Sequence, residues 1–315
     1  MAIDPNFLKR LLRGDRVVVA RAISMVENEH RDAVDLLRKI FSHTGRAYRI
    51  GITGPPGAGK STITNKLAKL YRGENRRVGI IAVDPTSPFT GGALLGDRVR
   101  MTDVDLDECV FIRSMASRGS LGGLSKKTKE AADVLDASGC DVILMETVGV
   151  GQSELDIARA ADTTVVVLVP ESGDSIQAMK AGLMEIADFF VVNKADRAGA
   201  EQAVMSIKMV LSFKHGVSGW MPDVLKSVAN EGKGIDEIAS MITLHRQFLQ
   251  DHDYLKKKRE ERTIERIREL IDEHLRMEFW NEEREKLLFS KIQQVLSLTI
   301  TPYDLIEQLI KNFKT

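Results

Sequence analysis

The sequence has few cysteines and aromatic residues, and it carries no net charge. Only 2 of its 315 residues are cysteines, Cys109 and Cys140, and they form no CxxC pair, so we expect two reduced thiols. Lys plus Arg and Asp plus Glu number 45 each, so no overall field attracts nucleic acid or an anionic membrane. No apolar run approaches the roughly 18 residues of a membrane span. We therefore expect no nucleic-acid or membrane partner, and a cytoplasmic protein, or one of the mitochondrial matrix if the source is eukaryotic.

Three regions of different periodicity are present. Residues 1–46 carry apolar residues at helical spacing behind a capping Asp15, which predicts a helical N-terminal extension. Residues 47–245 alternate short β-branched apolar runs with helical stretches. That alternation predicts an α/β domain with a mostly parallel, doubly wound sheet covered by helices on both faces. Residues 246–315 predict a C-terminal helical arm.

The elements of the middle region can be placed from these patterns. The predicted strands are Tyr48–Thr53, Val78–Val83, Val110–Ile112, Val142–Met145, Thr164–Val169, Phe189–Val192 and Val224–Ser227. The predicted helices are Ser61–Tyr71, Lys126–Ala137, Ile176–Met184 and Gly199–Ser212.

The arm has an apolar stripe on an otherwise charged helix. Its residues step by three or four positions and so share one helix face: Ile264, Ile267, Ile271, Leu275 and Phe279. Such a stripe can lie on its own domain or against a second copy of the chain. We expect dimerisation through this arm.

A glycine-rich loop with the pattern GxxxxGK[ST] follows the first predicted strand. It runs from Gly54 through Gly57, Ala58 and Gly59 to Lys60, Ser61 and Thr62, where a helix begins. Glycines let successive N–H groups converge on one anion at a helix N-terminus. We expect Lys60 to bind the β and γ phosphates catalytically, and Ser61 to give its hydroxyl to Mg²⁺. The alternative is a glycine-rich turn without a ligand. Strand, loop and helix together predict a P-loop NTPase.

A second loop selects the base. Asn193, Lys194 and Asp196 form an NKxD motif directly after a predicted strand. A carboxylate at Asp196 can accept from guanine N1–H and from the exocyclic amine, and adenine offers neither. The segment Ser227-Val228-Ala229 ends the next strand and resembles one that contacts guanine O6 through the main chain. The two loops together predict a GTPase that binds GTP and GDP, although a helix start is the alternative for the second loop.

Further acidic residues are placed to assist magnesium. Glu146 and Gly149 stand in the DxxG position, where a carboxylate assists the metal and a glycine N–H meets the γ-phosphate. Whether Glu146 contacts the metal directly or through water stays open. Asp84 and Asp97 are either further metal carboxylates or solvent-exposed loop acids.

The residue that orients water in Ras-like GTPases has no counterpart at its usual place. In those proteins a Gln follows the DxxG glycine, whereas this sequence has Val150 there and Gln152 two positions on. We assign Gln152, together with Lys60 and Glu146, as the candidate catalytic residues. We expect slow intrinsic hydrolysis that a partner accelerates.

The strings AVDPTSPFTGGALLGDRVRM (82–101), ETVGVGQSE (146–154), GDSIQAMKAGLMEIAD (173–188) and NKAD (193–196) resemble the MeaB/ArgK family of P-loop GTPases, over residues of about 10–250. The resemblance implies a homodimeric chaperone of a cobalamin-dependent acyl-CoA mutase, chiefly methylmalonyl-CoA mutase. It also implies that the chaperone gates delivery of adenosylcobalamin, which the mutase and not this chain binds, and protects the enzyme. By the same resemblance, Ser61, Asp84, Asp97 and Glu146 form the magnesium region.

The resemblance further implies a switch within 171–180 that answers to the mutase, with Asp174, Gln177 and Lys180 as candidates. This chain departs from the family here, because Ala181 follows Lys180 where relatives carry paired lysines. A metallochaperone GTPase of hydrogenase or urease maturation is one alternative function. It is disfavoured because the histidines and cysteines are scattered. A transport-associated protein kinase is the other, and nothing here marks an acceptor site for it.

Overall fold

The computed structural model describes residues 3–84, 104, 106–116, 123–147, 152–172, 182–212, 219–311 and 313. It contains two compact units, Met1–Lys258 and Arg259–Thr315. The boundary expected at 245/246 lies within helix α11 (Ile235–Asp251), and the units divide further along, inside helix α12 (Tyr254–Phe279).

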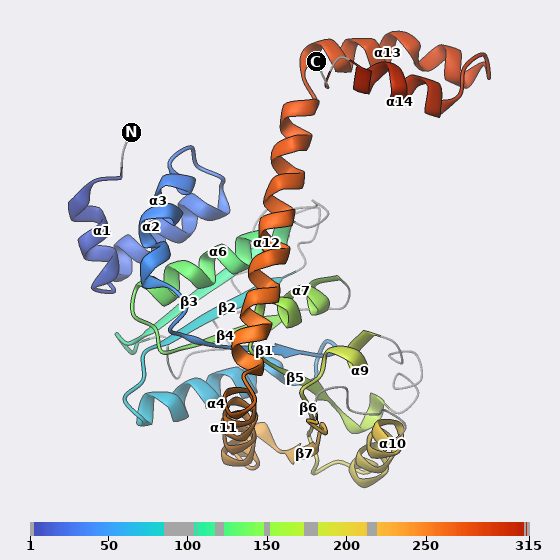
Figure 1. Ribbon diagram of the computed structural model, residues 1–315. Coiled ribbons are helices and arrows are strands. Elements are labelled where there is room, and N and C mark those ends of the chain that lie inside the picture. The colour runs from blue at the N-terminus through green and yellow to red at the C-terminus, as the bar shows by residue number, and fades with distance from the viewer. Residues whose placement is uncertain are drawn as a thin grey trace. The chain divides into compact units, whose positions relative to one another are not determined.

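The first unit is built on a seven-stranded sheet in the order β3-β2-β4-β1-β5-β6-β7, and all paired strands are parallel (Figure 1). Every residue of β1, β4 and β5 is buried, as expected for strands of a parallel sheet that is covered on both faces. The strands are β1 Tyr48–Thr53, β2 Val78–Asp84, β3 Val110–Ala116, β4 Val142–Thr147, β5 Thr163–Leu168, β6 Phe189–Asn193 and β7 Val224–Ser227. Each predicted strand is confirmed to within a few residues, and the α/β fold class is confirmed with them.

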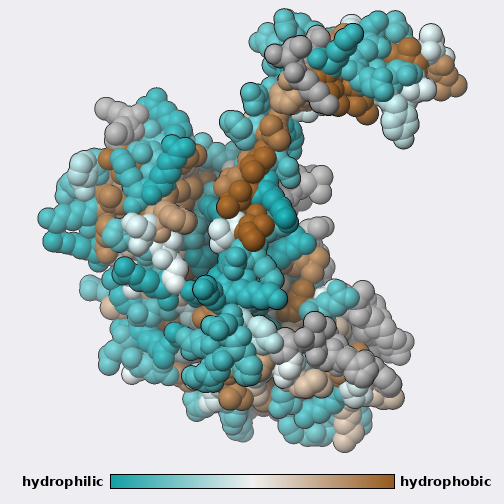
Figure 2. All heavy atoms as spheres, in the orientation of Figure 1, coloured by the Kyte–Doolittle hydropathy of each residue, from teal (hydrophilic) through white to brown (hydrophobic). Residues whose placement is uncertain are grey.

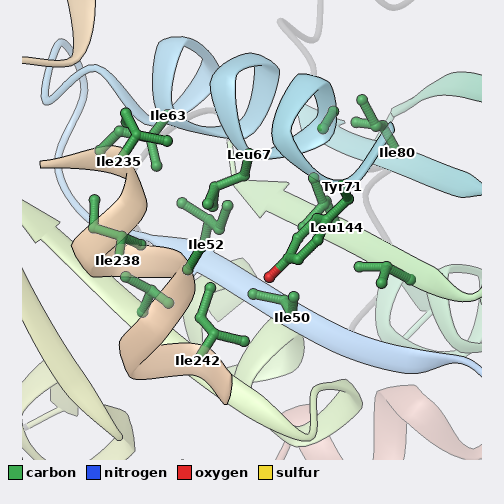
Figure 3. Close-up of a cluster of buried hydrophobic side chains, with 14 of the residues drawn as sticks. Ile50, Ile52, Ile63, Leu67, Tyr71, Ile80, Leu144, Ile235, Ile238 and Ile242 are labelled. Carbon is green, nitrogen blue, oxygen red and sulfur yellow. The ribbon is translucent and has the colours of Figure 1, made fainter. Parts of the chain in front are cut away.

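Helices cover both faces of this sheet. Helices α4 (Lys60–Gly73) and α11 pack on one face through Ile63, Leu67, Ile238 and Ile242 (Figure 3). Other helices pack on the opposite face, where their buried hydrophobic residues form clusters with those of the strands. These helices are α2 Arg16–Glu27, α6 Gly123–Ala137, α7 Gln152–Ala160, α9 Gly182–Ile186 and α10 Ala200–Ser212. Of the predicted helix Ile176–Met184, residues 176–181 lie outside the described residues, and the helix that is described continues to Ile186.

The N-terminal extension consists of short helices, α1 (Pro5–Leu12), α2 and α3 (Ala33–Ile40). Asp15 caps α2 as predicted, because its carboxylate accepts from the N–H groups of Val17 and Val18. Helix α2 packs against α6 and so joins the extension to the sheet.

The second unit continues α12 and adds α13 (Glu282–Leu296) and α14 (Pro302–Lys311). The Arg284 guanidinium lies 5.0 Å from the ring centre of Phe279 and 5.1 Å from that of Phe313, which holds the end of α14 near the start of α13. Apolar side chains line one side of α12 (Figure 2). Within this unit the stripe is solvent-exposed, at 44% for Ile264, 52% for Ile267 and 51% for Ile271.

Candidate functional site

The glycine-rich loop between β1 and α4 lies at the carboxyl edge of the sheet, where parallel α/β sheets bind ligands. Two of its glycines are required by close contacts. Gly54 has φ 135° and a Cβ there would collide with the Val167 carbonyl oxygen. Gly59 has φ 91° and a Cβ would collide with Asn193 Nδ2. The loop therefore reaches this conformation only with glycine at both positions.

Lys60 is the first residue of α4, and its ammonium is held inside the loop. Nζ donates to the carbonyl oxygens of Gly54 at 2.7 Å and Pro55 at 2.9 Å. Burial lowers the pKa of Lys60, and the charge of Glu146 opposes that shift. Such a buried cation, set among main-chain groups, is suited to meet the negative charge of a phosphate.

Asn193 joins three segments of the site. Its Nδ2 donates to the Ala58 carbonyl oxygen at 2.8 Å, which ties the end of β6 to the glycine-rich loop. Its Oδ1 accepts from Ser227 Oγ at 3.0 Å and from the Ala229 N–H at 3.1 Å. All these atoms are buried, so one side chain fixes the glycine-rich loop and the ends of β6 and β7 relative to each other.

These segments enclose a cavity of about 860 Å³, which is within the size range of small-molecule sites. Lys194, with φ 58°, and the exposed Asp196 lie on its wall. The residues that line it are Pro56, Gly57, Gly59, Lys60, Ser61, Thr62, Thr147, Asn193, Lys194, Asp196, Arg197, Val228, Ala229, Asn230 and Glu231. The two predicted motifs thus meet at one cavity. Four other predicted residues belong to the same loops and strand ends but do not line the cavity: Gly54, Ala58, Glu146 and Ser227.

The oxygen groups on the phosphate side fit a magnesium ion. The Ser61 hydroxyl lines the cavity at the start of α4. The fully buried carboxylate of Glu146 accepts from Thr64 Oγ1 at 2.7 Å, so it lies beneath the first turns of the same helix. Thr147 lines the cavity too and contacts Thr53 through their hydroxyls at 3.2 Å. Mg²⁺ prefers oxygen ligands and retains waters, and this donor set meets that preference.

For several predicted site residues, the side chain or the whole residue lies outside the described part of the structure. Asp84 ends β2 and Gln152 begins α7 on the main chain, but their side chains lie outside the described part. Gly149, Asp97 and the switch candidates Asp174, Gln177 and Lys180 also lie outside the described residues.

The cavity contains residues that the motifs do not reveal. Arg197, Asn230 and Glu231 line it, and Thr64 positions Glu146. Arg197 and Glu231 each follow a recognised motif closely in the sequence, so proximity to the motif is the signal that could have found them. Thr64 carries no such signal, because its role depends on a contact with a distant strand.

Neither a clustered metal site nor a membrane-spanning helix is found in the described part of the chain. No three His, Cys, Asp or Glu side chains there are grouped to hold a metal ion. None of the helices described is long and apolar enough to cross a membrane.

A parallel α/β sheet with a phosphate loop and a base-selecting loop at one cavity defines a P-loop GTPase. The chain belongs to the MeaB family, because a family model described as methylmalonyl Co-A mutase-associated GTPase MeaB matches residues 19–284. GTPase ArgK of Escherichia coli is 36% identical over 98% of this chain and 96% of its own length. The mouse methylmalonic aciduria type A homolog, mitochondrial, is 33% identical over 97% of this chain and 78% of its own. A crystal structure of an LAO/AO transport system kinase matches with a TM-score of 0.77 and 30% identity over the whole of both chains.

Proposed function

We propose that this GTPase is a chaperone that gates the loading of adenosylcobalamin onto methylmalonyl-CoA mutase and protects that mutase. The observation that carries the proposal is the family match, whose description names association with this mutase and whose range covers the whole cavity. The name of the mouse relative refers to methylmalonic aciduria, which is consistent with the same metabolic enzyme. In this proposal the mutase binds the cobalamin, and this chain supplies the nucleotide-dependent control.

The cavity supports a specific assignment of the nucleotide. The triphosphate lies against Gly57–Thr62, with Lys60 at the β and γ phosphates and Ser61 and Glu146 in the magnesium region. The base lies between Lys194 and Val228–Ala229 with its N1–H and amine on Asp196. Magnesium, when bound, stabilises the charge that develops on the phosphates.

We assign turnover control to the residues that the sequence motifs predict for the γ-phosphate and magnesium region. We propose that Gln152, together with Asp84, Asp97 and Gly149, completes the hydrolytic site only when the mutase is bound. Asp174, Gln177 and Lys180 form the segment that responds to the mutase. Purified protein alone should then hydrolyse GTP slowly, and addition of the mutase should accelerate it.

Co-precipitation with a purified cobalamin-dependent mutase tests the proposal. Association should differ between GTP, GDP and a non-hydrolysable GTP analogue, and methylmalonyl-CoA mutase should bind better than an isobutyryl-CoA mutase. Equal association in every nucleotide state would remove the gating role while leaving the GTPase assignment in place.

A second function is considered because a solved structure 30% identical to this chain is titled a transport system kinase. A kinase would transfer the γ-phosphoryl group to a protein hydroxyl. Incubation with γ-labelled GTP and cell extract distinguishes the two, because a chaperone GTPase releases all label as inorganic phosphate. Stable label on a protein acceptor would favour the kinase.

We also propose that the chain forms a homodimer through the apolar stripe of α12. The support is the exposure of Ile264, Ile267, Ile271 and Leu275 along one helix face within the second unit. An exposed apolar row of this length is a common mark of a protein interface.

A further inference from the structure

We propose that Glu171 and Glu231 are positioning residues for guanine recognition, because they hold two cations away from the carboxylate of Asp196. The inference deepens the proposed nucleotide site and rests on Asp196 contacting the base. It concerns residues that belong to neither of the recognised nucleotide motifs.

The first cation is Arg197, the residue directly after Asp196. Arg197 lines the nucleotide cavity, and its guanidinium donates to Glu171 Oε1 at 2.5 Å. Glu171 lies in the short 3-10 turn Pro170–Ser172 that follows β5, so the ion pair spans two loops at the carboxyl edge of the sheet. Both side chains are about half exposed, at 51% and 53%.

The second cation is Lys233, on the turn after β7. Its ammonium contacts Glu231 Oε2 at 2.6 Å, and Glu231 itself lines the cavity. The turn is closed by the Val228 N–H, which donates to the Lys233 carbonyl oxygen at 3.0 Å. Lys233 is thereby kept beside the segment expected to meet guanine O6.

Asp196 lies near both cations. Glu171 is the main cause of a raised pKa for Arg197, and Glu231 is the main cause for Lys233. The charge of Asp196 adds to both shifts. The main chain brings the three groups together, because Arg197 directly follows Asp196 and the Ala195 N–H donates to the Ser227 carbonyl oxygen at 3.0 Å, next to the Val228 that bonds to Lys233. Neither cation is paired with Asp196 in the structure, since each hydrogen bonds to its own glutamate instead.

This arrangement matters because of what Asp196 has to do. To select guanine, its two oxygens must both accept hydrogen bonds, from N1–H and from the exocyclic amine. A guanidinium or ammonium that paired with those oxygens would compete with the base, since charged donors bind carboxylates more strongly than neutral ones. Glu171 and Glu231 remove that competition by offering each cation an alternative partner.

The test measures the affinity of fluorescent GDP, with unlabelled IDP and ADP as competitors, for the full-length protein. Glu171→Gln should weaken GDP binding about three- to fivefold, the scale of one exposed ion pair. It should also reduce the preference for GDP over IDP, which lacks the exocyclic amine. Raising the salt concentration should diminish the defect, because the competing pair is solvent-exposed.

The double variant Glu171→Gln/Arg197→Gln separates this role from a structural one. If Glu171 restrains a competing cation, removal of Arg197 as well should restore GDP affinity relative to Glu171→Gln. If the ion pair only fastens two loops together, the double variant should bind GDP as weakly as Glu171→Gln, and the inference is overturned. Glu231→Gln and Glu231→Gln/Lys233→Gln repeat the test at the second pair.

Two controls keep the outcomes distinct. Glu201→Gln breaks a matched exposed ion pair, Lys226–Glu201 at 2.5 Å, whose residues do not line the cavity, and should leave GDP binding unchanged. Asp196→Ala should abolish the preference for guanine nucleotides. If it does not, the proposed site itself fails. If it does while Glu171→Gln binds like wild type, only the positioning role fails.

Discussion

At the scale of single residues, one buried amide joins the segments of the site. Asn193 makes three hydrogen bonds that no other side chain could replace, because donor and acceptor point at different loops. The glycine at position 59 is required for the same contact, since only the missing Cβ lets Asn193 approach. Contacts between the Asn193 side-chain amide and the surrounding main chain therefore fix the geometry of the nucleotide site.

Asn193→Ala should weaken GDP binding by more than tenfold and lower the free energy of unfolding by about 1–3 kcal/mol, because it leaves buried main-chain groups without partners. Urea unfolding and a GDP titration measure the two effects. Asn230→Ala is the matched control, since Asn230 also lines the cavity but is solvent-exposed. Normal stability and GDP binding in Asn193→Ala would contradict this account of the site.

A buried histidine makes stability depend on pH. His245 is 1% exposed, and its Nδ1 lies 2.8 Å from Thr163 Oγ1. Burial lowers the pKa of His245 below its ordinary 6.5, against the opposing charge of Asp188. The unfolded chain therefore binds a proton that the folded chain resists, so stability should fall as the pH drops below about 6.5.

The urea midpoint of the wild type should thus decrease between about pH 7.5 and pH 5.5, and His245→Gln should show a smaller decrease. The difference in slope is the relevant quantity, because the substitution also disturbs packing at every pH. His252→Gln is the control for removal of an exposed histidine on the neighbouring turn. Equal slopes for wild type and His245→Gln would show that His245 does not titrate differently on folding.

At the scale of elements, the strands were predictable and the polar contacts between them were not. A buried parallel strand such as β5 is rich in β-branched residues, and that pattern is visible in the sequence. Two side-chain hydrogen bonds join residues that are far apart in the chain. One links Thr64 to Glu146, and the other links Tyr48 OH to Thr163 Oγ1 at 2.6 Å. No local pattern encodes such pairs. The Asp4 cap of α1 had no assigned role either, although Pro5 directly after it is a standard helix start.

We expect one apolar face of helix α11 to hold the helix against the sheet. Ile238 is fully buried against the sheet (Figure 3). Leu244 on the same helix is 57% exposed. Ile238→Ala should therefore lower the free energy of unfolding by about 2–5 kcal/mol, through lost burial and a cavity. Leu244→Ala should change it by less than about 1 kcal/mol. Similar losses for the two variants, measured by urea unfolding, would show that α11 is held in some other way.

At the scale of the whole molecule, the second unit exposes a row of apolar residues that a monomeric domain would normally bury. Its helix α12 has no buried residue along its 26 positions. A helix without a buried residue gains little from tertiary packing, yet Ile264, Ile267, Ile271 and Leu275 are aligned on it. The alignment is explained if a second chain covers these residues.

Ile267→Asp/Ile271→Asp should convert a dimer into a monomer, because two carboxylates would be buried without partners at the centre of the interface. Light scattering coupled to size-exclusion chromatography measures the mass directly, against 35.0 kDa for one chain. Met277→Asp is the matched control, since Met277 is 64% exposed on the same helix but points away from the stripe. GDP affinity should stay unchanged in all of them, because none of these residues lines the nucleotide cavity. A wild type that elutes with the mass of one chain, or a double variant that remains dimeric, would rule out this stripe as the interface.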